Sequence, residues 1–400
     1  MPLKSLIIAK VCMYGVSMMS VLDLPTPCVL VDLDKLEKNI RNAMDQARRH
    51  GKKLWPMVKT FKSTYIAKIL RDHGADGFLC GTIDEAEVLV EHGLGKTLML
   101  AYPVADEANL KRVVKLVESG TRLILRIDNR ENAEFLNEQL RRYGISLDYV
   151  VKVDVGLHRL GVKPERVVDF VKSLEKFQNL NFVGIATHPG NAYGARNPRE
   201  VEEIAKDVAK KMETAVRSLE SAGYKLEIVG TGSTPTLRFD VEEPVYTHLF
   251  PGNFVYYDRM QALVYGSAAL DDCALTVLAT VISKPEHAEG KLAIVNVGSK
   301  YLGLDKGAHG IEVVKGYGHI VEHPKAVIVG LSEEVGEVDI SEEPSVKVGE
   351  KINIIPNHSC VANNATSYLV GHRKGRVERL IRVDMRNGSR LAEVLANTVF

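Results

Sequence analysis

The sequence has almost no excess charge of either sign. Its 400 residues include 52 lysines and arginines against 51 aspartates and glutamates, for a net charge of +1. Binding to nucleic acid or to an anionic membrane surface usually relies on a basic excess, so the charge balance favours neither partner. A composition of 45% hydrophobic and 26% charged residues is instead typical of a soluble globular protein.

Cysteines are few, and apolar runs long enough to span a membrane are lacking. The sequence has five cysteines: Cys12, Cys28, Cys80, Cys273 and Cys360. Because they are odd in number and scattered, they indicate no disulfide framework and are typical of a reducing compartment. The apolar stretch 11–22 is too short to cross a bilayer, and no secretory cleavage site follows it. We therefore expect a cytoplasmic protein in which residues 1–24 form an N-terminal tail.

From Cys28 to Asp258, short apolar runs alternate with longer segments of helical periodicity. The runs are rich in valine, isoleucine and leucine, as expected for strands buried on both faces, and span residues 54–58, 77–80, 97–101, 122–127, 148–153, 181–187, 226–229 and 245–250. The helical segments span residues 63–73, 83–92, 106–118, 130–142, 164–176 and 198–222. This alternation predicts a (β/α)₈ barrel of the TIM type. An open doubly wound sheet is the alternative, but no G-x-G-x-x-G motif follows the first strand.

After Asp258 the pattern changes to short strand-like segments separated by glycines and prolines. These segments span residues 273–283, 291–297, 311–314, 326–330, 351–356 and 367–373. Few helical segments lie between them, which predicts a second, mostly β domain. We expect the barrel to span residues 25–265 and the β domain 266–400, although residues 25–33 could add a strand to the β domain.

Reactive side chains follow several of the predicted barrel strands. In barrels of this type the C-terminal ends of the strands carry the chemistry. Lys59 ends the first strand, and desolvation there would lower its pKa toward that of an imine-forming amine. Arg159 follows the fifth strand in a loop bracketed by glycines, and His188 and Tyr193 follow the sixth. A solvated lysine at a strand end is the alternative interpretation of Lys59.

A glycine-rich loop follows the seventh predicted strand. It reads Gly230-Thr231-Gly232-Ser233-Thr234 and offers several backbone N–H groups and hydroxyls. Barrels often bind phosphate at this position, although an ordinary tight loop is an equally good interpretation of the motif alone. An imine-forming lysine and a phosphate loop together are what pyridoxal 5′-phosphate requires, so we expect this cofactor.

A pair of candidate metal ligands, His358 and Cys360, lies in the predicted β domain. On a strand, residues two apart point to the same face, so this imidazole and thiolate could chelate zinc. A buried cysteine beside a packed histidine is the alternative.

These motifs resemble those of the fold-type III, alanine-racemase-like pyridoxal phosphate enzymes, and most closely the D-threonine aldolases and eukaryotic-type D-serine dehydratases. The resemblance covers nearly the whole chain from about Leu24. It rests on P-M-V-K-T-F-K (56–62), V-D-V-G-x-x-R-x-G-V (153–162), H-P-G-N-A-Y (188–193), G-T-G-S-T (230–234), P-G-N-F-V-Y-Y-D (251–258), L-S-E-E (331–334) and P-N-H-S-C (356–360).

The resemblance implies a role for each matching residue. Lys59 would carry the cofactor, Arg159 would lie near its phenolic oxygen, His188 would pack against its ring and Tyr193 would approach its pyridine nitrogen. The phosphate would be held by Gly230, Thr231, Gly232, Ser233 and Thr234 together with the Gly252-Asn253 backbone. His358 and Cys360 would hold a divalent metal, zinc by preference, near the β-hydroxyl of the substrate. Enzymes of this type are homodimers in which the β domain of one subunit faces the barrel of the other.

The implied function is a lyase that acts on 3-hydroxy-D-amino acids. The family pattern has a histidine where this chain has Phe61, and a phenyl ring can neither transfer a proton nor bind a metal. This difference and the His-x-Cys pair favour dehydratase-type β-elimination over aldolase-type retro-aldol cleavage. One alternative is an amino-acid racemase, with Tyr301 or Tyr317 as a second base. Another is a pyridoxal phosphate-binding protein without catalytic activity.

Overall fold

The computed structural model describes residues 19–307, 312–392 and 395–396. The chain forms two compact units. One contains the described residues up to Asn39 together with Val255–Val383, and the other contains Ile40–Phe254 and the described residues from Asp384 onward. Most of the predicted N-terminal tail, including Cys12, lies outside the described residues.

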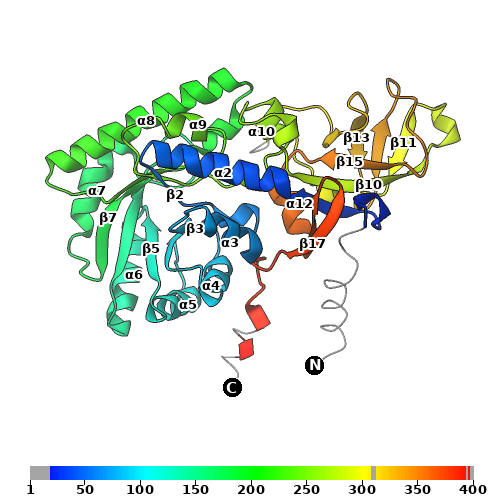
Figure 1. Ribbon diagram of the computed structural model, residues 1–400. Coiled ribbons are helices and arrows are strands. Elements are labelled where there is room, and N and C mark those ends of the chain that lie inside the picture. Colours follow the sequence, from blue (N-terminus) through cyan, green and yellow to red (C-terminus); the bar gives the residue numbers. More distant parts are fainter. Residues whose placement is uncertain (1–18, 308–311, 393–394, 397–400) are drawn as a thin grey trace. The chain divides into compact units, whose positions relative to one another are not determined.

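The second unit is built on a barrel of parallel strands (Figure 1). Its sheet has eight strands in the order β2-β9-β8-β7-β6-β5-β4-β3, and a parallel bridge between Met57 and Leu79 joins the chain after β2 to β3. The strands are β2 (Lys53–Leu54), β3 (Phe78–Cys80), β4 (Thr97–Leu100), β5 (Arg122–Ile127), β6 (Leu147–Lys152), β7 (Leu180–Ala186), β8 (Ile228–Thr231) and β9 (His248–Leu249). The predicted TIM-type barrel is confirmed.

Helices follow these strands where the periodicity predicted them, except that the short α9 was not predicted. They are α3 (Thr64–Asp72), α4 (Ile83–Glu91), α5 (Glu107–Glu118), α6 (Arg130–Tyr143), α7 (Val167–Leu174), α8 (Pro198–Ser221) and the short α9 (Leu237–Asp240). Polar caps define where several of them begin: Asp106 Oδ1 accepts a hydrogen bond from Asn109 N at 2.8 Å, and Asn129 Oδ1 accepts one from Asn132 N at 2.8 Å. Gly144 ends α6 in the left-handed conformation, with φ of 67°.

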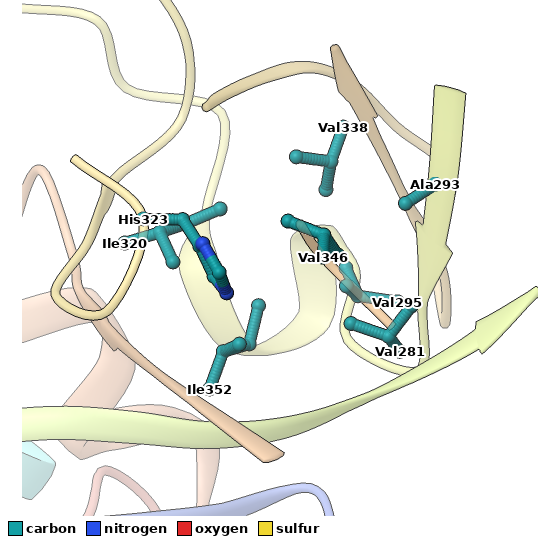
Figure 2. A pocket seen from close by; sticks show the side chains of 8 residues that line it. All are labelled: Val281, Ala293, Val295, Ile320, His323, Val338, Val346 and Ile352. Atoms are coloured by element: carbon teal, nitrogen blue, oxygen red, sulfur yellow. The ribbon is translucent and has the colours of Figure 1, made fainter. Parts of the chain in front are cut away.

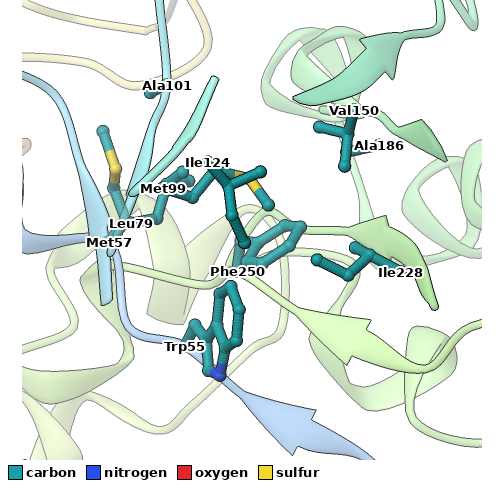
Figure 3. Packing of buried hydrophobic residues seen from close by; sticks show 10 residues of the cluster. All are labelled: Trp55, Met57, Leu79, Met99, Ala101, Ile124, Val150, Ala186, Ile228 and Phe250. Atoms are coloured by element: carbon teal, nitrogen blue, oxygen red, sulfur yellow. The ribbon is translucent and has the colours of Figure 1, made fainter. Parts of the chain in front are cut away.

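Apolar side chains fill the barrel interior (Figure 3). The cluster comprises Trp55, Met57, Leu79, Met99, Ala101, Ile124, Val150, Ala186, Ile228 and Phe250. One or two residues from each strand or its extension supply it, because alternate residues of a barrel strand point inward. This packed core supports the C-terminal ends of the strands, where the candidate site lies.

The first unit contains a nine-stranded sheet. Its main path runs β13-β14-β11-β10-β1-β16-β17, and β15 pairs with both β10 and β12. The strands are β1 (Cys28–Asp32), β10 (Leu275–Ser283), β11 (Leu292–Val295), β12 (His319–Ile320), β13 (Val327–Leu331), β14 (Gly336–Asp339), β15 (Lys351–Ile355), β16 (Tyr368–Arg373) and β17 (Arg376–Arg382). β1 pairs antiparallel with β10 and parallel with β16. The helices of this unit are α2 (Leu33–Arg49), which continues into the other unit, α10 (Arg259–Leu263), α11 (Ser299–Leu302) and α12 (Ser359–Ala365).

The strand predicted at 311–314 is wrong for the residues that the structure describes. Residues 312–314 belong to no strand, and Ile311 lies outside the described residues. The amides of Val313 and Val314 both donate to the carbonyl of Lys306, at 2.9 and 3.2 Å. A local loop therefore uses the backbone groups that a strand would have offered to a neighbour.

A small apolar cavity lies within the β domain (Figure 2). Its walls are Val281, Ala293, Val295, Ile320, His323, Val338, Val346 and Ile352. His323 is its one polar wall residue, and its Nε2 lies 2.8 Å from Glu350 Oε1. We interpret the cavity as a packing gap, because its walls offer a ligand no convergent polar groups.

Among the described residues, no helix has the length and apolar character needed to cross a membrane.

Candidate active site

Lys59 lies in a short 3₁₀ turn, Val58–Thr60, directly after the first barrel strand. The strand pairing continues up to this turn, since Met57 N donates to Pro251 O at 2.9 Å. Lys59 is exposed whereas Val58, Thr60 and Phe61 are buried. The turn thus holds one amine on the accessible side of a packed segment. Phe61, which replaces the family histidine, is fully buried and belongs to the core.

A buried ion pair braces the segment that carries Lys59. Lys62 Nζ lies 2.6 Å from Glu85 Oε1, and their side chains are only 7% and 0% exposed. Lys62 Nζ also donates to Asn387 Oδ1 at 2.7 Å, and Gly81 N donates to Glu85 Oε2 at 2.6 Å. A Cβ on Gly81 would lie 3.3 Å from the Cβ of Lys59. Glu85 therefore links the two backbone segments on either side of the Lys59 side chain.

Replacing Lys62 by methionine is expected to lower the free energy of unfolding by about 3–5 kcal/mol, because it leaves the Glu85 carboxylate buried without its partner. Burial already raises the pKa of Glu85, an effect that the charge of Lys62 opposes. Urea unfolding followed by the fluorescence of Trp55, the single tryptophan, measures the change. Lys53→Met is the matched control, since the exposed Lys53–Asp76 pair should contribute at most about 1 kcal/mol. A similar loss in both variants would contradict the prediction.

Arg159 lies in a tight loop after β6 that two carboxylates hold in place. Asp154 Oδ1 accepts hydrogen bonds from Gly156 N and His158 N, both at 3.0 Å, and Asp128 Oδ2 accepts one from Gly161 N at 2.9 Å. A Cβ on Gly161 would lie 2.5 Å from the Asp154 nitrogen, so this position requires glycine.

The guanidinium of Arg159 is exposed and lies 6.0 Å from the centre of the Tyr102 ring. The motif at residues 153–162 had indicated the arginine, but the two carboxylates that brace its loop, Asp154 and Asp128, were not predicted as site residues.

His188 lies at the end of β7 and is held as a neutral imidazole. Its Nδ1 lies 2.7 Å from the carbonyl oxygen of Gly232, which can only accept, so Nδ1 carries the proton and Nε2 presents a lone pair. Burial, followed by the charge of Lys152, lowers the pKa of His188 well below 6.5. The charges of Lys59 and Arg159 act in the same direction. The structure thus brings His188 together with Lys59, Arg159 and the glycine-rich loop.

The ring of Tyr193, in the 3₁₀ turn Gly190–Gly194, lies 6.2 Å from that of His188 at an interplanar angle of 41°. These two aromatic groups, both indicated by the motif at residues 188–193, therefore lie side by side after β7.

The glycines of the two proposed phosphate segments pack against neighbouring chain. A Cβ on Gly232 would lie 2.5 Å from the backbone carbonyl carbon of Phe250, and one on Gly230 would lie 2.2 Å from the Phe250 ring. A Cβ on Gly252 would lie 2.7 Å from Thr60 Oγ1, within the Lys59 turn. Residues 230–234 and 252–253 are all buried. The seventh and eighth strand ends and the Lys59 turn therefore meet at close range.

Two buried cations, Lys152 and Arg126, were missed from the sequence. Burial lowers the pKa of Arg126 to about 10, and its Nη2 has no hydrogen-bond partner in the described structure. Burial and the nearby charges of Arg126 and Arg159 lower the pKa of Lys152 well below 10.5. The available signal was a basic residue inside each otherwise apolar run: Arg126 in 122–127 and Lys152 in 148–153. A wholly buried strand rarely carries a cation.

The barrel residues fit pyridoxal 5′-phosphate. The charge of buried Lys152 acts on His188 beside them, and the Thr234 hydroxyl, which can donate, is buried with no partner in the described structure. An anionic, hydrogen-bonding group would compensate both features. Lys59 supplies the amine, and residues 230–234 supply closely packed backbone and hydroxyl groups at the end of β8.

His358 and Cys360 do not lie on a strand, so the same-face argument, which assumed an extended chain here, does not apply. β15 ends at Ile355, His358 is the N-cap of α12 and Cys360 lies in its first turn. Hydrogen bonds to residues distant in the sequence turn the chain here: Asn357 Nδ2 donates to the carbonyls of Asp305 and Gly316, at 2.8 and 2.9 Å. The two side chains still interact. Burial acts to lower the pKa of His358, but the negative charge of Cys360 and hydrogen bonds to Asp305 and Cys360 outweigh it and raise that pKa well above 6.5.

A carboxylate that the sequence did not indicate orients His358. Asp305 Oδ2 lies 3.0 Å from His358 Nδ1, so Nε2 is the ring nitrogen that does not contact this carboxylate. A metal-binding histidine commonly donates its other ring N–H to a carboxylate, so the imidazole, thiolate and carboxylate fit a divalent metal. Asp258 fixes the start of α12 by accepting from Ser359 N at 3.1 Å. Within the described residues, no three ligating side chains cluster closely enough to form a complete protein-only site.

Comparison with known proteins agrees with this architecture. Residues 31–260 match the family model described as "Alanine racemase, N-terminal domain", and residues 274–371 match one described as "Putative serine dehydratase domain". A 3-hydroxy-D-aspartate aldolase of Paracoccus denitrificans (strain Pd 1222) is 28% identical over 376 residues, which cover 91% of this chain and 92% of that protein. A D-serine dehydratase of Dictyostelium discoideum is 29% identical over 370 residues, which cover 85% and 91%.

A solved structure shares the fold over nearly its whole length. It is a metal-free form of a D-threo-3-hydroxyaspartate dehydratase in which one cysteine is replaced by alanine. It has a TM-score of 0.83 and 26% sequence identity, and the match covers 91% of this chain and 99% of that one. The chain therefore belongs to the alanine racemase N-terminal domain family, that is, to the fold-type III group of pyridoxal 5′-phosphate enzymes.

Proposed function

We propose that this protein is a pyridoxal 5′-phosphate- and metal-dependent lyase acting on 3-hydroxy-D-amino acids. The observation that carries the proposal is the arrangement at the barrel end, where the exposed Lys59 amine, neutral His188 and the closely packed loop 230–232 come together. The names of the relatives, a D-serine dehydratase and a 3-hydroxy-D-aspartate aldolase, support the substrate class, since both substrates carry a β-hydroxyl on a D-amino acid.

Each barrel residue has a role that its environment supports. Lys59 would hold the cofactor, and its amine would accept the proton of the substrate Cα. His188 would pack against the cofactor ring and accept a hydrogen bond at Nε2, because Nδ1 already donates to Gly232. Arg159 would lie near the phenolic oxygen and Tyr193 near the ring nitrogen. Pyridoxal 5′-phosphate bound by these residues would supply the sink for the electrons released at Cα.

His358 and Cys360 would bind the metal, and Asp305 would keep the imidazole oriented. We propose zinc because imidazole and thiolate are the ligands that zinc prefers. The solved neighbour that is a metal-free cysteine variant supports a metal-binding cysteine in this family. The metal would act as a Lewis acid on the substrate β-hydroxyl.

We favour β-elimination over retro-aldol cleavage. In β-elimination the Cα–H and Cβ–O bonds break, hydroxide leaves, and hydrolysis of the remaining enamine gives a 2-oxo acid and ammonia. Retro-aldol cleavage needs a base for the β-hydroxyl and breaks Cα–Cβ to give glycine and an aldehyde. Phe61 offers no such base, and its ring is fully buried.

We further propose that the protein is a cytoplasmic homodimer that binds neither nucleic acid nor membrane.

Incubation of the purified protein with D-serine and D-threonine tests the reaction. We expect pyruvate and 2-oxobutanoate with stoichiometric ammonia, and no product from the L-enantiomers. Glycine and acetaldehyde from D-threonine would show the aldolase reaction instead. Interconversion of enantiomers without 2-oxo acid or aldehyde would overturn the lyase proposal in favour of a racemase.

A further inference from the structure

A chain of hydrogen-bonding side chains runs from the glycine-rich loop into the protein. Ser233 Oγ lies 2.9 Å from Thr236 Oγ1, and Thr236 Oγ1 lies 2.6 Å from Asp240 Oδ2. The three residues are 3%, 0% and 1% exposed. One end of the chain is thus in the loop proposed to hold the cofactor phosphate, and the other is a buried carboxyl group on α9.

The surroundings of Asp240 favour its protonated form. Its Oδ1 has no hydrogen-bond partner in the described structure, so an ionised carboxylate would keep one oxygen buried and unsatisfied. Burial raises the pKa of Asp240 to about 8; the hydrogen bond from Thr236 opposes this shift, and the negative charge of Glu243 adds to it. The phenol of Tyr246 is another titratable group that faces Asp240. Burial, together with the charges of Asp240 and of Glu213 on α8, raises the pKa of this phenol well above 10.

One cation, Arg238, lies on the same short helix as Asp240, and Glu202 on α8 faces it. Burial lowers the pKa of Arg238, an effect that Glu202 opposes. Arg238 does not contribute to the shift of Asp240. Among the described residues, no positive charge contributes to the pKa shift of Asp240.

The state of Asp240 decides which way the hydroxyls point, because each hydroxyl has a single proton to donate. With an ionised carboxylate, Thr236 must donate to Asp240, and Ser233 in turn donates to Thr236. Ser233 then presents only lone pairs to the loop. With a protonated carboxyl, Asp240 can donate to Thr236 and Thr236 to Ser233, so the Ser233 proton remains available.

We propose that Asp240 is a positioning residue for the cofactor: in its protonated form it directs the Thr236 and Ser233 hydroxyls so that Ser233 donates a hydrogen bond to the cofactor phosphate. This inference rests on the proposed function, because it takes the loop 230–234 as the phosphate site. A phosphate ester above pH 7 carries almost two negative charges and has no proton to donate, so it distinguishes sharply between a donor and a lone pair.

The test compares pyridoxal 5′-phosphate with pyridoxal, which lacks the phosphate, by absorbance titration of the cofactor-free protein from pH 7 to 9. The ratio of the two dissociation constants cancels the pH dependence that Lys59 contributes to both. If only the protonated form of Asp240 binds phosphate well, the preference for the phosphate ester should fall about tenfold between pH 7 and 9 in the wild type.

Two variants test the direction of the hydrogen bonds that link Asp240, Thr236 and Ser233. Asp240→Asn keeps a donor toward Thr236 at every pH, so its preference should stay at the wild-type pH 7 value and change less than about twofold up to pH 9. Ser233→Ala removes the final donor, so its preference should be low at pH 7 and equally insensitive to pH. Asp169→Asn, at an exposed position on α7, is the control and should behave as the wild type.

The possible outcomes separate the two proposals. A wild-type preference that does not change with pH, or an Asp240→Asn variant that keeps the tenfold change, would overturn the role of Asp240 while leaving cofactor binding intact. Failure of the wild type to bind pyridoxal 5′-phosphate at all would overturn the proposed function and this inference with it. If Asp240→Asn does not fold, an unchanged pH dependence in Ser233→Ala would overturn the inference by itself.

Discussion

The Lys59→Ala variant is expected to be colourless and to lose at least ~10⁴-fold in kcat on D-serine, because it removes both the amine that holds the cofactor and the base for the Cα proton. Lys59 is the exposed residue of a turn whose other residues are buried, so the substitution removes a side chain without opening a cavity in the core. The visible absorption spectrum of the purified protein and a pyruvate assay measure the two losses.

The control for this variant is Lys53→Ala, at a lysine of β2, the strand that precedes the Lys59 turn. Lys53 is 55% exposed and pairs with Asp76 at 3.1 Å on the surface. Its loss should leave both the absorption band and the activity within about twofold of the wild type. A Lys59→Ala protein that keeps the wild-type band would show that another amine carries the cofactor, and the assignment of Lys59 would fail.

The His358→Ala and Cys360→Ala variants are each expected to lose bound zinc and at least ~100-fold in lyase activity while keeping the cofactor absorption band. Each substitution removes one of the two donors that the chain offers at the start of α12. Metal analysis of the purified variants and the pyruvate assay give the two measurements. Treatment of the wild type with EDTA should reproduce the loss of activity, and zinc should then restore the wild type but not the variants.

Two further variants sharpen this test. Asp305→Asn, which weakens the bond to His358 Nδ1, should lower zinc affinity by about 10- to 100-fold without removing it. His287→Ala, at an exposed histidine of the same unit, should change neither zinc content nor activity. Full activity in EDTA-treated protein would contradict the metal proposal, and enantiomer interconversion that persists under EDTA would point to a racemase.

Several features of the barrel could be predicted because their signals are local. Strands buried on both faces require continuous apolar runs, and helices packed on one side require a 3.6-residue period, so the runs at residues 122–127 and 148–153 and the helix after Asn129 could be placed. Lys59 and the loop 230–234 could be predicted for the same reason. Each directly follows such a strand, and the C-terminal ends of barrel strands converge.

The proposed metal ligands show where this reasoning fails. Residues 351–356 do form a strand up to Ile355, but the alternation was extended by assumption to His358 and Cys360. The chain turns because the Asn357 side chain donates to carbonyls 52 and 41 residues earlier in the chain. No local pattern indicates these bonds, and the same holds for Asp305, which orients His358 from 53 residues away.

The sequence by itself determined the family and the barrel, and it placed Lys59 and the loop 230–234 at strand ends, because each of these depends on residue types at fixed short spacing. Only the tertiary structure decided the state of the groups around that lysine. The neutral tautomer of His188 depends on a carbonyl 44 residues away, and the brace behind Lys59 depends on a buried pair 23 residues apart. Protonation state follows from burial and from neighbouring charge, and folding creates both by bringing distant strand ends together.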